Sequence, residues 1–530
     1  MTLKQRVSII FIVVMTILTR FIVLDKVPSH LSNDEISIAY DAYSILHTGR
    51  DEHNNFMPVS FQSHSTYKAP FYIYAASVTN LFLGNSEYSV RLPSAIFGSL
   101  TVLIVGFIVF ILSKNINLSI LTSLVLALSP WHIYASRMAL ESNAALFLLV
   151  SAIWLFFINI RNKNNFYLFF SMMLFALSIW AYHTEWLLTP MIMVFLAINY
   201  RHKIKINISF WVSILLFFII VFPIASDAWM MRNTNARANT EVIVKDPGIA
   251  RILDDPDVSL FRKIRTISSS FIVNYSNYTK VSHLFFDGMP LLSKEDPYTV
   301  GLFLLPLLIF FWWGIFKIKL YFPNDFKFVY FWILATPLIP SLTIGGTNMV
   351  RNLATVVPYT LVISVGLYSL RSYFKGYKAV ILCLLVAISF LYFSVIYYYH
   401  FPFQMGENFQ YGYKQAAEYI KDNYEKYDRI VVDPRFGNVN IYVGVPHLYL
   451  AYFTNLDPNK MLLRRDTSTG LYFDKYKISS INWNQEIIKD RTLYLVPFDN
   501  QATSNVKNLR TVKEIKLPNY KVEFILYESY

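Results

Sequence analysis

Eleven apolar stretches, each close to the length that a helix needs to cross a bilayer, dominate this sequence. A transmembrane helix takes about 20 consecutive apolar residues, because each residue adds about 1.5 Å along a hydrocarbon core about 30 Å thick. Only 15% of the 530 residues are charged, against about a quarter in soluble domains. The chain is therefore predicted to be an α-helical polytopic membrane protein. The stretches are 7–25, 91–112, 117–134, 143–160, 166–182, 186–200, 207–226, 299–316, 328–345, 353–370 and 379–399.

Basic residues flank these stretches in a pattern that predicts the orientation of the chain. With the N-terminus in the cytoplasm, the inner loops contain most of the short-loop lysines and arginines, as the positive-inside rule requires. The net charge of +13 is attributed to these loops and to contact with membrane lipid rather than to nucleic acid. The first stretch lacks a small-residue cleavage site and is interpreted as an uncleaved anchor. The inner-loop residues are Lys114, Arg161, Lys163, Arg201, Lys203, Lys205, Lys317, Lys319, Lys327, Arg371, Lys375 and Lys378.

Three polar segments are too long to be simple connections, and all of them are predicted to face outside. Residues 26–90 and 227–298 form outer loops of a membrane domain, 1–399. The apolar stretches 40–46 and 71–83 are predicted to be short helices on the membrane surface.

The third segment, 400–530, has a different composition from the rest of the chain. Apolar residues at helical spacing between 413 and 424 are followed by strand-like runs at 429–432, 492–496 and 520–527. This alternation predicts a small extracytoplasmic α/β domain.

Several classes of site are absent from the sequence. The single cysteine, Cys383, excludes an intramolecular disulfide framework and any multi-cysteine metal site. Motifs of dinucleotide-binding folds, P-loops, zinc proteases and serine hydrolases do not occur. No motif indicates a nucleotide-sugar donor.

Acidic residues just outside the first span are the first candidates for chemistry, because charge beside a membrane is costly unless it is hydrated or paired. In Asn33-Asp34-Glu35, a carboxylate can act as a general base or hold a metal ion. The alternative, which the residues alone favour, is that Ser32, Asn33 or Asp34 caps a helix. Both roles can fall on adjacent residues.

Two basic residues in outer loops are candidates for binding a phosphate. Lys68 precedes an aromatic apolar stretch and can hold a phosphate as a point charge, or can extend toward lipid headgroups. Arg351 stands in a short outer loop, where the positive-inside rule disfavours it, so an anion-binding role is more plausible than for the inner-loop residues.

Other polar residues are predicted to lie in the same outer layer. Arg137 and Glu141 are four residues apart, which an ion pair within one helix would explain. His183 and Glu185 point to different faces of a helix, so a shared metal there is disfavoured, and both are predicted to line a hydrated pocket.

Taken together, these segments resemble a known family, the polyprenyl-phosphate-sugar-dependent membrane glycosyltransferases of fold class GT-C, which are related to protein O-mannosyltransferases and the lipid A aminoarabinose transferase. The resemblance covers most of residues 1–400. The C-terminal segment matches only in kind, as a soluble outer domain. The residues that carry the resemblance are Asn33-Asp34-Glu35, Tyr40-Asp41-Ala42-Tyr43-Ser44, Gly49-Arg50-Asp51, Pro58, Tyr67-Lys68-Ala69-Pro70, Tyr72, Ser89 to Ser94, Ser129-Pro130-Trp131-His132, Arg137, Glu141, Tyr182-His183 and Pro337 to Arg351.

The resemblance implies a role for each matching residue. Asp34 corresponds to the catalytic base, Glu35 completes an acidic pair, and Glu141 occupies a second acidic position. Lys68 corresponds to a lysine that holds the donor phosphate, although Ala69 intervenes here before the proline, and Arg351 corresponds to an arginine facing the same phosphate. Residues assigned to the substrate pocket are Tyr67, Arg137, Tyr182 and His183.

The resemblance thus implies an inverting glycosyltransferase of the plasma or inner membrane that uses a polyprenyl-phosphate sugar and an extracytoplasmic glycan, lipid or protein acceptor. No metal ligand is assigned and no cofactor is certain. Asp34 and Glu141 are compatible with a divalent metal, and metal-free action is equally compatible. The alternatives are a flippase or transporter of a lipid-linked glycan, and a glycan polymerase or ligase. Transport is disfavoured because the polar residues gather in outer loops rather than inside the spans.

Overall fold

The computed structural model describes residues 1–63, 66–229, 241–291, 298–436, 444–500, 502 and 508–530. The described chain divides into two compact units. Unit 1 consists of Met1–Ile22, Val59–Tyr72 and Pro93–Val395, and unit 2 of Val23–Pro58, Ile73–Leu92 and Ile396–Tyr530.

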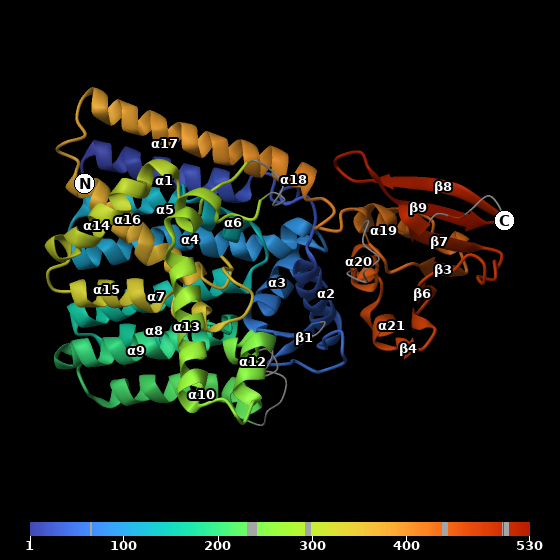
Figure 1. Ribbon diagram of the computed structural model, residues 1–530, viewed down its shortest axis with the longest axis horizontal. Helices are drawn as coiled ribbons and strands as arrows, with labels where there is room; N and C mark the ends of the chain where they lie inside the picture. Colours follow the sequence, from blue (N-terminus) through green and yellow to red (C-terminus); the bar gives the residue numbers. More distant parts are fainter. Residues whose placement is uncertain (64–65, 230–240, 292–297, 437–443, 501, 503–507) are drawn as a thin grey trace. The chain divides into compact units, whose positions relative to one another are not determined.

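Unit 1 is built from apolar helices, and each of the eleven predicted stretches contains at least one. Figure 1 shows α4, α7, α8, α9 and α10 running in nearly the same direction, while α13 runs across them. Helix α7 packs on α8, α8 on α10, and α14 on α16. The helices, in chain order, are α1 (Leu3–Phe21), α4 (Glu87–Ser113), α5 (Ile116–Ala127), α6 (Pro130–Arg137), α7 (Glu141–Asn162), α8 (Asn165–Ala181), α9 (Glu185–Tyr200), α10 (Ile208–Trp229), α12 (Pro247–Asp254), α13 (Leu260–Thr279), α14 (Leu308–Tyr321), α15 (Phe326–Ala335), α16 (Val356–Ser369) and α17 (Tyr377–Val395).

Four helices in the described part of the chain are long and apolar enough to cross a membrane, and a bent pair would make a fifth. The four are α4, α7, α10 and the continuous helical segment that begins with α17. The remaining predicted stretches contain shorter or more polar helices, so the number of eleven spans stays a prediction.

Predicted stretches 117–134 and 299–316 differ from the helices observed within them. Stretch 117–134 is broken into α5 and α6, which meet at 61°, because Ser129 and Pro130 start a new helix with Ser129 as its cap. Stretch 299–316 becomes helical only from residue 305, in a 3₁₀ turn that leads into α14 at Leu308. The segment before this turn is not helical, since Val300 and Phe303 form backbone hydrogen bonds with residues 289 and 284.

Unit 2 contains the predicted helix and strands of the C-terminal segment. Within the described residues, seven strands form one sheet in the order β4-β5-β6-β3-β7-β9-β8. The central strand β3 runs parallel to β6 and β7, and the other pairs are antiparallel. The strands are β3 (Arg429–Val432), β4 (Arg465–Thr467), β5 (Gly470–Phe473), β6 (Tyr476–Ile478), β7 (Thr492–Pro497), β8 (Leu509–Lys516) and β9 (Val522–Ser529).

Helices from both ends of the sequence also pack together in unit 2. They include α2 (Asn33–Thr48), most of α3 (Pro70–Leu83), α18 (Phe401–Gln404), α19 (Gly412–Asp422), α20 (Pro446–Phe453) and α21 (Pro458–Leu462). Helix α20 packs against α2 and α19. The Tyr449 hydroxyl donates to the Leu31 carbonyl at 2.7 Å, just before α2 begins. Unit 2 therefore contains the C-terminal segment together with parts of the first predicted outer loop. The domain boundary at 399/400 stays a prediction.

Candidate active site

The N-terminus of α2 shows which residue caps this helix. The Ser32 hydroxyl accepts the Glu35 backbone N–H at 3.3 Å, and the Glu35 carboxylate accepts the Ser32 N–H at 3.0 Å. This reciprocal pair is a capping box, so the cap is Ser32 rather than Asp34. Asp34 lies in the same first turn and is exposed. The positive end of the helix dipole stabilises a negative charge at this position.

Glu35 has a buried partner that the sequence did not indicate. Its carboxylate and the Arg91 guanidinium form two hydrogen bonds, of 2.9 and 3.1 Å, and both side chains are fully buried. Arg91 also donates to the carbonyl oxygens of Leu24, Pro28 and His30. One arginine thus fixes both the start of α2 and the segment that leads into it.

A second buried charge cluster follows α2. One Glu52 carboxylate oxygen lies 3.3 Å from Nε2 of His53, and the other lies 3.7 Å from Nη1 of Arg464. Burial alone would raise the pKa of Glu52, but the His53 hydrogen bond and the nearby charges of His447, His53 and Arg464 outweigh it and lower that pKa. The carboxylate is therefore held in its charged form.

Lys68 and Glu141 are brought to the same place in unit 1. Strand β1 (Phe61–Ser63) pairs antiparallel with β2 (Thr66–Lys68), and Lys68, the last residue of β2, is buried with 3% exposure. The backbone N–H of Ala69 donates to Glu141 Oε1 at 2.6 Å. Glu141 is the first residue of α7, so one carboxylate fixes the Lys68 segment to a helix N-terminus. Tyr67, on the same strand, is half-buried.

Arg137 and Glu141 lie on different helices, because α6 ends at Arg137 and α7 begins at Glu141. The predicted ion pair within one helix is therefore wrong. Arg137 is fully buried and its Nη1 donates to the carbonyl oxygens of Thr19 and Ile22 at 3.1 and 2.9 Å. The arginine thus satisfies carbonyl groups at the C-terminal end of α1, where a positive charge is favourable.

Arg351 is held inside its own loop and by the middle outer loop. Its Nη1 donates to Thr343 Oγ1 at 3.1 Å and to the Ile344 carbonyl at 2.8 Å, and its Nη2 lies 3.2 Å from the Glu241 carboxylate. The loop turns through Gly345 and Gly346, whose φ angles of 94° and 72° suit glycine.

Two aromatic side chains hold this loop from other segments of unit 1. The Tyr278 hydroxyl at the end of α13 donates to the Gly346 carbonyl, and Nε1 of Trp131 in α6 donates to the Met349 carbonyl at 2.9 Å. The sequence pattern gave no sign of these tertiary contacts.

Tyr182 and His183 lie between α8 and α9. Tyr182 is buried and its backbone N–H closes the end of α8, while the His183 ring lies 5.5 Å from the Trp186 ring. The neighbouring Glu185 accepts a hydrogen bond from Thr189 of its own helix. These two predicted pocket residues and Glu185 thus cluster at one end of α9.

Residues 67–226 match the family model for dolichyl-phosphate-mannose-protein mannosyltransferase. In structure the chain is similar to ArnT from Cupriavidus metallidurans in the apo state, with a TM-score of 0.56, 12% sequence identity, and coverage of 98% of this chain and 97% of that one. The same protein bound to undecaprenyl phosphate gives a TM-score of 0.55 and 11% identity at the same coverage. No curated protein sequence matches the chain.

The chain has the GT-C fold. The predicted resemblance to polyprenyl-phosphate-sugar-dependent membrane glycosyltransferases of this class is thereby confirmed. The apolar helices and this fold make the chain an integral membrane protein.

The family-matched segment of this GT-C chain contains most of the predicted site. Lys68, Tyr67, Arg137, Glu141, Tyr182 and His183 all fall between residues 67 and 226 and belong to unit 1, as does Arg351. Asp34 and Glu35 belong to unit 2. The joint action of the two groups of residues stays a proposal.

In the part of the chain that the structure describes, no three His, Cys, Asp or Glu side chains are grouped so that they could hold a metal ion.

Proposed function

We propose that the chain is an inverting glycosyltransferase that moves a sugar from a polyprenyl-phosphate donor to an acceptor hydroxyl on the extracytoplasmic side of the membrane. The observation that carries this proposal is the burial of Lys68 at the end of strand β2. The residue that follows it, Ala69, donates its backbone N–H to the Glu141 carboxylate. A lysine side chain is rarely this buried, and an ammonium group whose backbone segment is fixed in this way is suited to bind a phosphate as a point charge. The family match, which begins at residue 67, and the GT-C fold support the same function.

The proposed chemistry is one displacement at the anomeric carbon. The acceptor oxygen forms a bond to that carbon while the bond from the carbon to the phosphate oxygen breaks, and its electron pair stays on the phosphate. The acceptor proton passes to Asp34. Negative charge therefore grows on the phosphate, where Lys68 and Arg351 stabilise it, and a single displacement inverts the anomeric centre.

The acceptor is proposed to be a glycan, a lipid or a protein, and the product decides among them. The test is transfer of radiolabelled sugar from a panel of polyprenyl-phosphate hexoses and pentoses in membranes that contain the chain, with and without EDTA. Labelled product from at least one donor supports the proposal and identifies the acceptor. If no donor gives transfer although folded protein is present in the membranes, the proposal is contradicted. The alternative of a flippase for a lipid-linked glycan is then favoured.

Lys68→Ala is expected to lower the rate of transfer by about 10²- to 10³-fold, the effect of removing one group that stabilises developing negative charge. It should also raise the donor concentration needed for half-maximal rate, since the lysine binds the phosphate in the ground state as well. Initial rates across a donor titration measure both effects. The matched control is Lys375→Ala, an exposed lysine between α16 and α17. If the two variants have equal rates and equal donor requirements, Lys68 does not bind the donor phosphate.

A further inference from the structure

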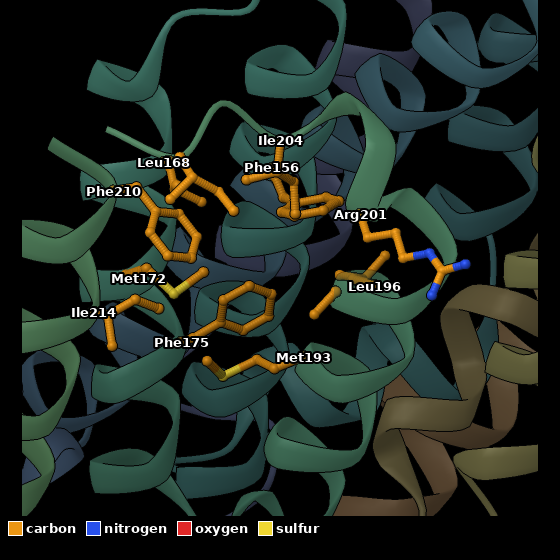
Figure 2. A pocket seen from close by; sticks show the side chains of 12 residues that line it. Phe156, Leu168, Met172, Phe175, Met193, Leu196, Arg201, Ile204, Phe210 and Ile214 are labelled. Carbon is orange, nitrogen blue, oxygen red and sulfur yellow. The ribbon is translucent and has the colours of Figure 1, made fainter. Parts of the chain in front are cut away.

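A partly open apolar cavity lies among four helices of unit 1. It has a volume of about 220 Å³ and is lined by side chains of α7, α8, α9, α10 and the segment between α9 and α10 (Figure 2). Its walls include Phe156, Leu168, Phe175 and Leu196, each at most 3% exposed. Because its lining is almost entirely aliphatic and aromatic, the cavity is suited to a hydrocarbon chain rather than to a polar ligand.

The cavity lies away from the predicted transfer site. Phe156 is 15 positions after Glu141 along α7, which places it about 22 Å farther along the helix axis. Arg201 likewise follows the C-terminal end of α9, whereas His183 precedes its N-terminal end. These are the helix ends that the positive-inside rule assigns to the cytoplasm. The cavity is therefore separate from the residues proposed to bind the sugar donor.

The edge of the cavity is basic. Among the described side chains that line it, Arg201 is the charged one, and Figure 2 shows its guanidinium directed away from the aromatic rings. Its Nε hydrogen-bonds Nε2 of the exposed His202 at 3.0 Å. A headgroup at this edge would thus meet the positive charge while its chain lay among apolar side chains.

A shallow hollow with a mixed polar and aromatic lining lies beside the same segment. It has a volume of about 580 Å³ and its lining includes Lys163, Asn165, Lys205 and Asn207. Between the last two of these, Ile206 lines the apolar cavity instead. One short stretch of chain therefore presents a basic side chain to one space and an apolar side chain to the other.

Acidic residues are scarce around this basic edge. Between residues 161 and 210 the sequence contains a single acidic residue, Glu185, at the opposite end of α9. Asp325 is paired with Arg161 at 2.7 Å. In the described chain, no carboxylate lies within ion-pair distance of Lys163, Arg201 or Lys205, so their positive charge is available to an anion.

We propose that this cavity binds one hydrocarbon chain of an anionic glycerophospholipid, with the lipid phosphate at Arg201 and the adjacent lysines. The argument joins an apolar volume to a basic edge, which is the complement of an acyl chain beneath a negatively charged headgroup. The site is independent of the proposed sugar transfer, because it shares no residue with it.

The test is native mass spectrometry of the purified, delipidated full-length chain titrated with dioleoyl phosphatidylglycerol, dioleoyl phosphatidylcholine or undecaprenyl phosphate. We expect one phosphatidylglycerol to bind about 10-fold more tightly than phosphatidylcholine. Arg201→Gln should remove most of this preference without changing phosphatidylcholine binding. Ala197→Phe, which places a ring in the cavity from α9, should weaken both lipids.

The control is Lys375→Gln, an exposed basic residue away from this lining, which should bind like the wild type. Equal affinity for the two glycerophospholipids, or an unchanged preference in Arg201→Gln, would overturn the proposal. Tighter binding of undecaprenyl phosphate that Ala197→Phe abolishes would also overturn it, since the occupant would then be a polyprenyl lipid.

Discussion

Asp34→Asn is expected to lower sugar transfer by about 10²- to 10⁴-fold, the usual contribution of a general base, while the chain still accumulates in the membrane. The amide has nearly the shape of the carboxylate but does not accept the acceptor proton. Folding should be preserved because Asp34 is exposed and the α2 cap is formed by Ser32 and Glu35 instead. Initial rates of label transfer, normalised to folded protein, measure the effect.

The matched control for this substitution is Asp25→Asn, the same change nine positions earlier in unit 2. It should leave the rate near that of the wild type. If Asp34→Asn retains near wild-type turnover, Asp34 is not the base. If both variants lose activity equally, the loss reflects the charge of the whole segment rather than proton transfer.

Local sequence signals predicted much of the architecture. Apolar stretches located a helix in every predicted span, and the pattern at 413–424 and the strand-like runs located α19, β3 and β7. The break between α5 and α6 was also visible in principle, because Ser129-Pro130 is a typical helix start. The late start of α14 could not be predicted in this way, because residues 299–304 are as apolar as the residues of a membrane-spanning helix. Their backbone instead forms hydrogen bonds with residues 284 and 289, which keep the segment out of a helical conformation.

The candidate site was predictable in its residue types but not in its contacts. The alternative of a cap at Ser32, Asn33 or Asp34 is resolved by geometry, which gives the cap to Ser32 and leaves Asp34 exposed. The partners of Arg351 and Glu35 lie 110 and 56 positions away in sequence. Periodicity describes one element at a time, so pairs this distant appear only once the chain is folded.

Arg91→Met is expected to destabilise unit 2 by about 3–5 kcal/mol, the usual effect of removing one partner of a buried ion pair. The substitution leaves the Glu35 carboxylate buried without its guanidinium, and it removes donors from the carbonyl groups of Leu24, Pro28 and His30. Because whole domains are stable by only about 5–15 kcal/mol, a large drop in the midpoint of thermal unfolding in detergent should follow. The control Arg50→Met, an exposed arginine of the same unit, should cost less than about 1 kcal/mol.

Adding Glu35→Gln to Arg91→Met separates charge from hydrogen bonding in this effect. Glutamine at the third position of a helix still completes a capping box, so the start of α2 keeps its cap while the buried negative charge is removed. The double variant should therefore regain part of the lost stability. It should not regain the part contributed by the hydrogen bonds from Arg91 to the three carbonyl groups. A double variant no more stable than Arg91→Met would show that the ion pair contributes little. In that case the bonds from Arg91 to the backbone, rather than its pairing with Glu35, hold the segment that carries Asp34.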